Sequence, residues 1–235
     1  MDWIGGHLGY LWDLVVTHAA LSVPPIVIGF LASVPLGYWA SRSRIARGVL
    51  LTVGNVLYTI PALALILLVP VILGFALLDP KNVLVALTVY AVAIMIRSAA
   101  DAFASVSPAV RQSAEAQGFS AGQRFWRVEL PLAGPVLLAG VRVVSVSTVS
   151  LATVGSLAGI SSIGDLFTDG YLRSFGLEIG VGIVLVLLLA AVFDLILNAV
   201  GGLLMPWNRR QKVSRAAGRA LSQPTPAGTG AGSGL

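Results

Sequence analysis

Long apolar stretches constrain this chain more than any other feature of its sequence. Runs of roughly 20 or more residues are dominated by Leu, Val, Ile, Ala and Gly, and most charged residues stand between them. A helix needs about 20 apolar residues to cross the hydrocarbon core of a bilayer. We therefore expect an all-α integral membrane protein with about five transmembrane helices, at residues 19–40, 48–77, 83–104, 131–157 and 177–205.

The composition argues against several other classes of protein. Only 11% of the 235 residues are charged and 57% are hydrophobic, whereas a soluble domain carries about 25% charged residues. The net charge of +5 does not indicate nucleic-acid binding, because the basic residues cluster at the ends of apolar runs. The chain has no cysteine, and its two histidines, His7 and His18, make no ligand set. We expect no metal site and no cofactor in this chain.

The placement of Lys and Arg predicts the orientation of the spans. On one side only Lys81 and Arg173 are found, and the other side holds the basic residues at positions 42, 44, 47, 111, 124, 127, 209, 210, 212, 215 and 219. Short cytoplasmic loops are enriched in Lys and Arg. We therefore expect a multi-pass protein of the plasma or inner membrane, with its N-terminus outside and its C-terminus in the cytoplasm.

The chain divides into three parts around these spans. Residues 1–18 hold Trp3, Tyr10 and Trp12, and aromatic rings of this kind prefer the headgroup level. We expect a short interfacial helix there, with the fraying start of the first span as the alternative. Residues 19–206 form the transmembrane domain. Residues 207–235 form a basic tail rich in Pro, Gly, Ser and Thr, which we expect to be disordered and cytoplasmic.

Two spans carry prolines. The second is longer than one crossing requires and contains Pro61 and Pro70, so we expect a broken or strongly tilted helix. The first contains Pro24, Pro25 and Pro35, and we expect kinks there.

Ionisable residues inside the spans cost about 2.5–3.5 kcal/mol or more each at the bilayer centre, and therefore need partners. Arg142 and Asp194 each lie 11 residues from the cytoplasmic end of their span, roughly 16 Å deep. We expect them to pair, and the alternative is that one of them lines a path and touches a solute. Arg97 and Asp101 stand four residues apart and are expected to pair along one helix.

A polar island at residues 107–133 interrupts the apolar sequence. Ser107 and Pro108 fit the N-cap and first position of a short helix, and Gly118 fits its C-terminal end. Ser120 and Gln123 form an S-x-x-Q capping box for a second short helix. Two capped helices on the cytoplasmic side favour a docking surface, and the alternative is a capped loop without a partner.

The spacing of this island resembles that of the permease subunits of binding-protein-dependent ABC importers. Their cytoplasmic loop reads E-A-A, three residues, Gly, nine residues, Ile, one residue, Leu-Pro. Taking Gly118 as the glycine places Val128 at the Ile position and Leu130-Pro131 at the Leu-Pro. The E-A-A positions are Gln112, Ser113 and Ala114. Gln therefore stands where Glu is usual, and Glu115 lies three residues further on.

Other stretches resemble the osmoprotectant branch of this family, which imports glycine betaine, choline and carnitine. They are NVLYTIPALAL (55–65), VALTVYAVAIMIRSA (85–99), VELPLAGPVLLAGVR (128–142) and ATVGSLAGISSIGDLF (152–167). The resemblance covers residues 10–205 and implies the fold of a type I ABC importer permease. It implies that cytoplasmic coupling helices at about residues 105–130 dock on an ATPase. The coupling residues that it implies are Gln112, Ser113, Ala114, Glu115, Gly118, Phe119, Leu130 and Pro131.

The resemblance also implies partners. They are ABC ATPase subunits that bind ATP and Mg²⁺, a second permease subunit, identical or paralogous, and an extracytoplasmic solute-binding protein. This chain has no G-x-x-x-x-G-K-[S/T] phosphate loop, so it is not the ATPase and is not expected to be an enzyme. The alternatives are an importer permease for another small solute, such as an amino acid, and a secondary transporter, although no internal repeat favours the latter.

A quaternary ammonium solute would be attracted to aromatic faces through cation–π contact. Tyr58, Tyr90, Phe75 and Phe167 are the aromatic candidates, and packing against lipid or core is the alternative for each. Tyr58 is the preferred one, because it precedes the expected break at Thr59 and Pro61, where irregular backbone lines a cavity at low cost. The expected path residues are Tyr58, Thr59, Pro61, Arg142 and Asp194.

Overall fold

The computed structural model describes residues 2–207, and every regular element in that range is helical. The elements are α1 (Asp2–Gly6), α2 (Leu8–Arg42), α3 (Arg44–Thr59), α4 (Ala62–Leu73), α5 (Lys81–Ala104), α6 (Pro108–Ala116), α7 (Ala121–Arg124), the π-helical turn η1 (Phe125–Glu129), α8 (Leu130–Ala152), the 3₁₀ turn η2 (Thr153–Ala158), α9 (Asp165–Leu172) and α10 (Gly176–Leu204). Among these residues, 4 helical segments are long and apolar enough to cross a membrane, or 5 if α3 and α4 together form one span. The expected all-α, multi-pass architecture is confirmed.

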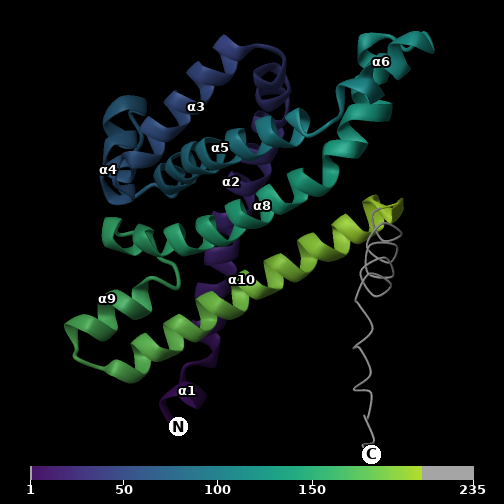
Figure 1. Ribbon diagram of the computed structural model, residues 1–235. Helices are drawn as coiled ribbons and strands as arrows, with labels where there is room; N and C mark the ends of the chain where they lie inside the picture. Colours follow the sequence, from purple (N-terminus) through teal and green to yellow (C-terminus); the bar gives the residue numbers. More distant parts are fainter. Residues whose placement is uncertain (1, 208–235) are drawn as a thin grey trace, which may run out of the picture.

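The long helices form one layered bundle. Helices α5, α8 and α10 lie side by side, with α6 at one end of the molecule and α9 at the other, and α2 crosses behind them (Figure 1). The most extensive helix–helix contact is that of α2 with α5. The predicted tail lies outside the described residues, apart from Trp207.

Helix α2 is one continuous element of 35 residues. It begins at Leu8, so most of the segment expected to form a separate interfacial helix belongs to the first long helix, and only α1 stands apart. The reason is packing: Leu11 and Leu14 are buried in the same cluster as Val149 and Leu166. The buried face of α2 therefore extends on the N-terminal side of residue 18. The three prolines of α2 lie inside this uninterrupted helix.

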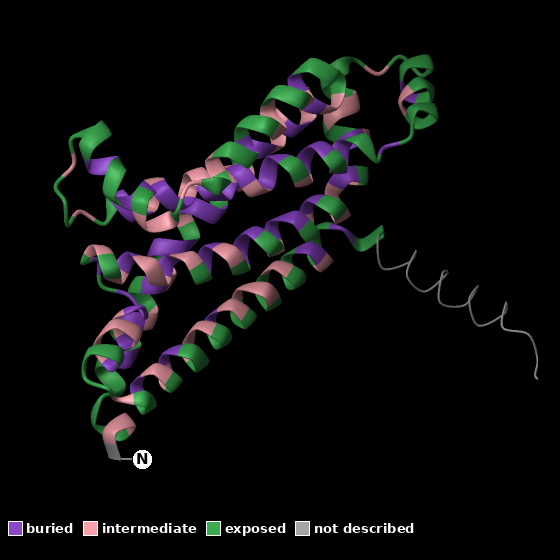
Figure 2. Ribbon diagram, turned by 60° about the vertical axis from the view of Figure 1, so that its left-hand side comes forward, coloured by how far each residue is buried: buried purple, intermediate pink, exposed green. Residues whose placement is uncertain are grey.

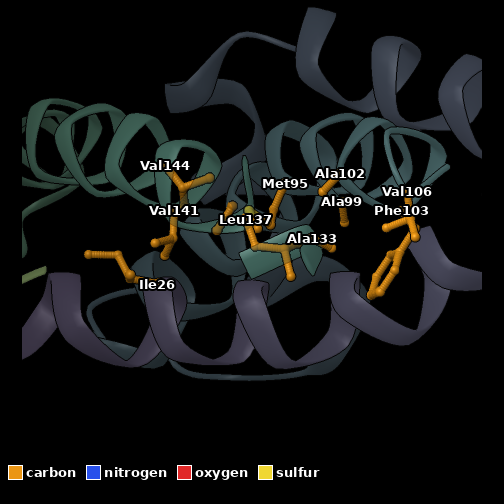
Figure 3. Packing of buried hydrophobic residues seen from close by; sticks show 11 residues of the cluster. Ile26, Met95, Ala99, Ala102, Phe103, Val106, Ala133, Leu137, Val141 and Val144 are labelled. Atoms are coloured by element: carbon orange, nitrogen blue, oxygen red, sulfur yellow. The ribbon is translucent and has the colours of Figure 1, made fainter. Parts of the chain in front are cut away.

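Small residues allow α2 and α5 to approach closely. Gly29, Ser33 and Gly37 recur at intervals of four along α2, and a Cβ added at Gly29 would come within 2.6 Å of the Cβ of Ala91 on α5. This small-xxx-small spacing brings helix backbones together within a membrane. Beside this seam lies a buried cluster that includes Ile26, Met95, Ala99 and Leu137 from α2, α5 and α8 (Figure 3). This spacing is visible in the sequence but was not among the predictions made from it.

The second span is broken, as Pro61 predicts. Helices α3 and α4 meet at an angle of 101°, and Ile60 and Pro61 between them have extended backbone. Both halves pack on α5. The bend turns the end of α3 into an irregular corner with an exposed aromatic side chain, Tyr58.

Candidate functional site

Helix α6 and the turn after it form the most regular part of the polar island. Ser107 and Pro108 occupy the predicted N-cap and first helical positions, although the Ser107 hydroxyl makes no capping hydrogen bond. Gly118 has φ +81°, which favours glycine. Its amide donates to the Glu115 carbonyl at 2.9 Å, and the Phe119 amide donates to the Ala114 carbonyl at 3.1 Å. This pair of bonds is a Schellman motif, and it fixes the end of α6 where the sequence predicts it.

The capping box is also present, but the helix that it starts is longer than expected. The Gln123 amide donates to the Ser120 hydroxyl at 3.3 Å, and the Ser120 amide donates to the Gln123 side chain at 3.0 Å. Helix α7 then continues through η1 into α8, so residues 121–158 form one helical segment. Pro131 lies inside this segment without ending it. It directly follows the π-helical turn η1, in which the Leu130 amide donates to the Phe125 carbonyl, and such a turn locally changes the hydrogen-bond pattern of the helix. The second expected short helix is therefore the first turn of a long one.

Glu129 ties the island to the rest of the protein. Its side chain is fully buried, and Arg42 donates to its Oε1 at 2.5 Å from the end of α2. The Nε atom of Arg124 donates to the same oxygen at 2.9 Å. The Nε atom of Arg111 on α6 lies 3.6 Å from Oε2, which makes an ion pair rather than a hydrogen bond. One buried carboxylate thus joins three basic side chains from three separate elements.

Glu115 contributes to the same cluster. Its carboxylate accepts a hydrogen bond from Arg124, which also contacts Glu129. The carboxylate nearest in sequence to the usual Glu position is therefore engaged inside the island. Gln112 and Ser113 are exposed on α6.

A small hollow of about 290 Å³ opens beside α6. Ser113, Ala114, Gln117 and Phe119 line it together with Val128 from η1. The structure thus brings Ser113, Ala114 and Phe119 of the expected coupling set to one place. Leu130 and Pro131 lie elsewhere: they line a larger groove between α2, α8 and α10.

The bend between α3 and α4 presents one aromatic ring. Tyr58 is 53% exposed, and its ring centroid lies 5.9 Å from that of Tyr90 in an edge-to-face arrangement. Tyr90 is buried, and its hydroxyl donates to the Ile60 carbonyl, one of the groups that the helix break leaves free. Thr59 and Pro61 are exposed beside it. At this bend Tyr90 is buried and Tyr58 is the accessible ring, and its place on a translocation path stays a prediction.

The other two aromatic candidates are already engaged. The Nζ atom of Lys81 lies 5.7 Å from the ring centroid of Phe75, so a cation of this chain is placed near that ring. The ring of Phe167 packs at Gly182 of α10, where an added Cβ would come within 2.9 Å of it.

The predicted pairing of Arg142 with Asp194 is confirmed. The Nε and Nη2 atoms of Arg142 donate to the two oxygens of Asp194 at 2.5 and 2.8 Å. Asn198 donates to the same carboxylate at 3.1 Å from one turn further along α10. The pair joins α8 to α10, and among residues 2–207 no hydrogen bond or ion pair connects it with Tyr58.

The expected pairing of Arg97 with Asp101 is wrong. Asp101 accepts from Arg47 of α3 at 2.5 Å, and Arg97 donates to the Asn55 side chain at 3.3 Å. Because α3 packs along α5, it offers each residue a partner from a neighbouring helix. A contact between helices thus replaced the local one.

Comparison with known proteins identifies the family. Residues 29–210 match the model of the binding-protein-dependent transport system inner membrane component. The chain belongs to this family.

Curated relatives of the permease cover nearly its whole length. It is 30% identical over 203 residues to the choline transport system permease protein OpuBB of Bacillus subtilis, which spans 86% of this chain and 90% of the relative. It is 28% identical over 204 residues to the glycine betaine/carnitine/choline transport system permease protein OpuCD of the same organism, spanning 86% and 88%. The osmoprotectant import permease protein OsmW of Salmonella typhimurium is 29% identical over 203 residues, spanning 84% and 93%.

Solved structures support the fold. A chain of the inward-facing MetNI methionine ABC transporter superposes with a TM-score of 0.74 at 20% identity, covering 83% of the permease and 96% of that chain. A chain of an amino acid ABC transporter superposes with a TM-score of 0.66 at 14% identity, covering 86% and 96%. The permease therefore has the fold of an ABC importer membrane subunit.

Glu129 was not predicted from the sequence as a member of this site. The available signal was a lone carboxylate directly before Leu130-Pro131, in a chain with several arginines on the same side. Its three partners come from α2, α6 and α7, so only the tertiary structure reveals them.

Proposed function

We propose that this permease forms the translocation path of an ATP-driven importer for osmoprotectants such as glycine betaine, choline or carnitine. The observation that carries the proposal is the group of relatives named for these solutes, at 25–30% identity over most of the chain. The methionine and amino acid transporters described above match as structures at 20% and 14% identity, and such a match supports the fold and not the substrate.

The exposed ring of Tyr58 supports this class of substrate. A quaternary ammonium group has no N–H to donate, so it is held by the π-face of an aromatic ring and not by hydrogen bonds. Tyr90 holds the corner in place by donating to the Ile60 carbonyl, which leaves the Tyr58 ring accessible. The Arg142–Asp194 pair joins α8 to α10 and has no net charge. In this proposal it stabilises the contact between these helices within the membrane, beside the path.

The energy comes from separate ATPase subunits, which bind ATP and Mg²⁺. They dock on the cytoplasmic island at residues 107–131, and the hollow beside Phe119 and the exposed face of α6 support this role. Glu129 connects α6 and α7 with the end of α2, so a displacement of the island is carried to the first span. ATP then favours one of two arrangements of the spans, because it binds more tightly to the ATPases in that arrangement.

The complete importer contains two permease subunits, identical or paralogous, and an extracytoplasmic solute-binding protein. The N-terminus lies outside and the C-terminus in the cytoplasm, in agreement with the distribution of basic residues. Single cysteines added at Ser107 and Leu172 test this orientation, because the chain has no other cysteine. A membrane-impermeant maleimide added to intact cells should label the cysteine at position 172 and not the one at position 107, and the reverse pattern would contradict the orientation.

The substrate class is tested by uptake into cells that lack other importers for these solutes. Cells that express the permease with its ATPase and binding protein should accumulate labelled glycine betaine, choline or carnitine, and should not accumulate labelled methionine. Uptake of methionine alone would contradict the osmoprotectant proposal and favour the amino-acid alternative.

Gln112→Glu tests the docking surface. Glu115 is engaged by Arg124, so the exposed face of α6 offers a neutral amide where relatives of this loop type carry a carboxylate. If the ATPase presents a basic residue to this position, the substitution strengthens association by about 1 kcal/mol, or roughly fivefold, because a charged hydrogen bond is stronger than a neutral one. Gln117→Glu makes the same chemical change within the lining of the hollow and tests whether a negative charge elsewhere on this docking surface has the same effect. Affinity unchanged by Gln112→Glu would show that the apolar hollow carries the contact.

A further inference from the structure

A large apolar groove lies at the surface of the bundle, away from the bend at Tyr58. Its volume is about 760 Å³, and its walls come from α2, α8 and α10. Leu31, Val34, Leu137, Val200 and Leu204 are among the side chains that line it. Because these three helices are candidate spans, the groove lies within the membrane. Helix α10 exposes much of its surface along its length (Figure 2).

The groove has the length of one membrane leaflet. Its lining runs on α8 from Leu130 to Val141, which is a rise of about 16 Å along a helix. Half of a hydrocarbon core about 30 Å thick is nearly the same length. The shallow end is at Leu130 and Leu204, on the side that carries the polar island.

Aromatic side chains mark that shallow end. Trp126 and Trp207 both line the groove there, and they are 68% and 40% exposed. Tryptophan is enriched where the hydrocarbon core meets the headgroups, because its ring is amphipathic. The two side chains therefore place the mouth of the groove at headgroup level.

One basic side chain beside the mouth, Arg127, forms no ion pair among residues 2–207. Arg127 is exposed, and it precedes Leu130 and Pro131 by three and four residues, so it lies on the helix face that borders the groove. In the described part of the chain, the ion pairs of the island engage Arg42, Arg111 and Arg124 but not Arg127.

We propose that this groove binds one anionic phospholipid, with an acyl chain between α2 and α10 and its phosphate beside Arg127. The ligand must be apolar over the length of one leaflet and negatively charged at one end, and an anionic phospholipid has this shape and charge. A small zwitterionic solute does not fit, because the lining offers it almost no polar partner. A second copy of the chain is the other candidate occupant, and the disulfide test below distinguishes it from a lipid.

The test uses phosphatidylglycerol with a photoreactive diazirine in its acyl chain. The assembled transporter is reconstituted in vesicles that contain this probe, irradiated, digested and analysed by mass spectrometry. Labelling is expected in the peptides that contain residues 26–35 and 197–205. Val200→Trp fills the groove and should abolish this labelling. Val192→Trp makes the same change on an exposed part of α10 outside the groove and should leave it intact.

The charge requirement is tested separately by Arg127→Gln, an exposed position where the fold is not at risk. The preference for phosphatidylglycerol over phosphatidylcholine should fall by about fivefold, the contribution of one basic residue at an anionic surface. An unchanged preference would overturn the assignment of Arg127. If Val200→Trp is labelled as strongly as Val192→Trp, the proposal that the lipid binds in this groove is wrong. Rapid disulfide formation between two Val200→Cys chains would show that a second copy covers it instead.

Discussion

Replacing Glu129 by Gln removes the charge that joins α2, α6 and α7. The carboxylate is fully buried, and Arg42, Arg111 and Arg124 surround it with side chains that are 31%, 18% and 12% exposed. Removing one partner of a buried ion pair costs 3–5 kcal/mol. Gln keeps one acceptor oxygen, and the arginines are partly screened by water, so we expect a loss of about 3 kcal/mol, at the lower end of that range.

The assay is thermal unfolding of the purified transporter, followed by the fluorescence of the five tryptophans of this chain or by loss of assembly. For a chain of 150–250 residues, about 1 kcal/mol shifts Tm by about 2–4 °C, so Glu129→Gln should lower Tm by about 6–12 °C. The number of solute molecules carried per ATP should also fall, because α6 loses its tether to α2.

Glu115→Gln is the matched control. It removes a carboxylate that contacts the same Arg124, but its side chain is 56% exposed. Exposed ion pairs contribute about 0–1 kcal/mol, so Tm should change by less than about 4 °C. If Glu129→Gln and Glu115→Gln lower Tm equally, Glu129 does not hold the island to the spans.

Three further sets of substitutions test other parts of the structure. Replacing Arg142 or Asp194 singly by Ala should reduce assembly and transport, and exchanging the two residues should restore both, as measured by complex yield and uptake. Gly37→Leu should prevent close packing of α2 on α5 and cost at least about 1–3 kcal/mol, whereas Gly48→Leu, with no atom within 4 Å of an added Cβ, should not lower the yield of folded protein. Tyr58→Phe should retain uptake, and Tyr58→Leu should raise the KM for a quaternary ammonium solute by about 2–5-fold, because a cation–π contact at an exposed site is worth about 0.5–1 kcal/mol.

Each of these outcomes has a contrary result. Failure of the exchanged pair to recover transport would show that Arg142 and Asp194 act separately. Normal yield of Gly37→Leu would mean that α2 and α5 do not pack as described. A KM unchanged in Tyr58→Leu would remove that ring from the path.

Local physical rules predicted the features that depend on chain geometry alone. Pro61 indicated a broken or tilted second span, because proline removes a backbone donor. The rule does not fix where a break occurs, since Pro24, Pro25 and Pro35 lie inside the continuous helix α2. Equal depth in the membrane predicted the Arg142–Asp194 pair, because helix rise converts sequence position into height. The end of α6 at Gly118 and the capping box at Ser120 were predicted, because such signals are contained within a few residues of sequence.

Features that depend on neighbouring helices could not be predicted in the same way. Asp101 had a local partner in Arg97, but the position of α3 gave it Arg47 instead. The first long helix extends back to Leu8, because α2 buries Leu11 against other elements and not because of a cap or a break. Glu129 acquires its role only when α2, α6 and α7 converge.

The central claim is that this permease and a separate ATPase import osmoprotectants together. Its most direct test is uptake of labelled glycine betaine, choline and carnitine into proteoliposomes that contain the purified permease, its ATPase and its binding protein. Uptake of at least one of these solutes is expected, and it should require ATP and all three components. Glu129→Gln should reduce the amount of solute taken up per ATP hydrolysed. Uptake that continues without ATP or without the ATPase would contradict it.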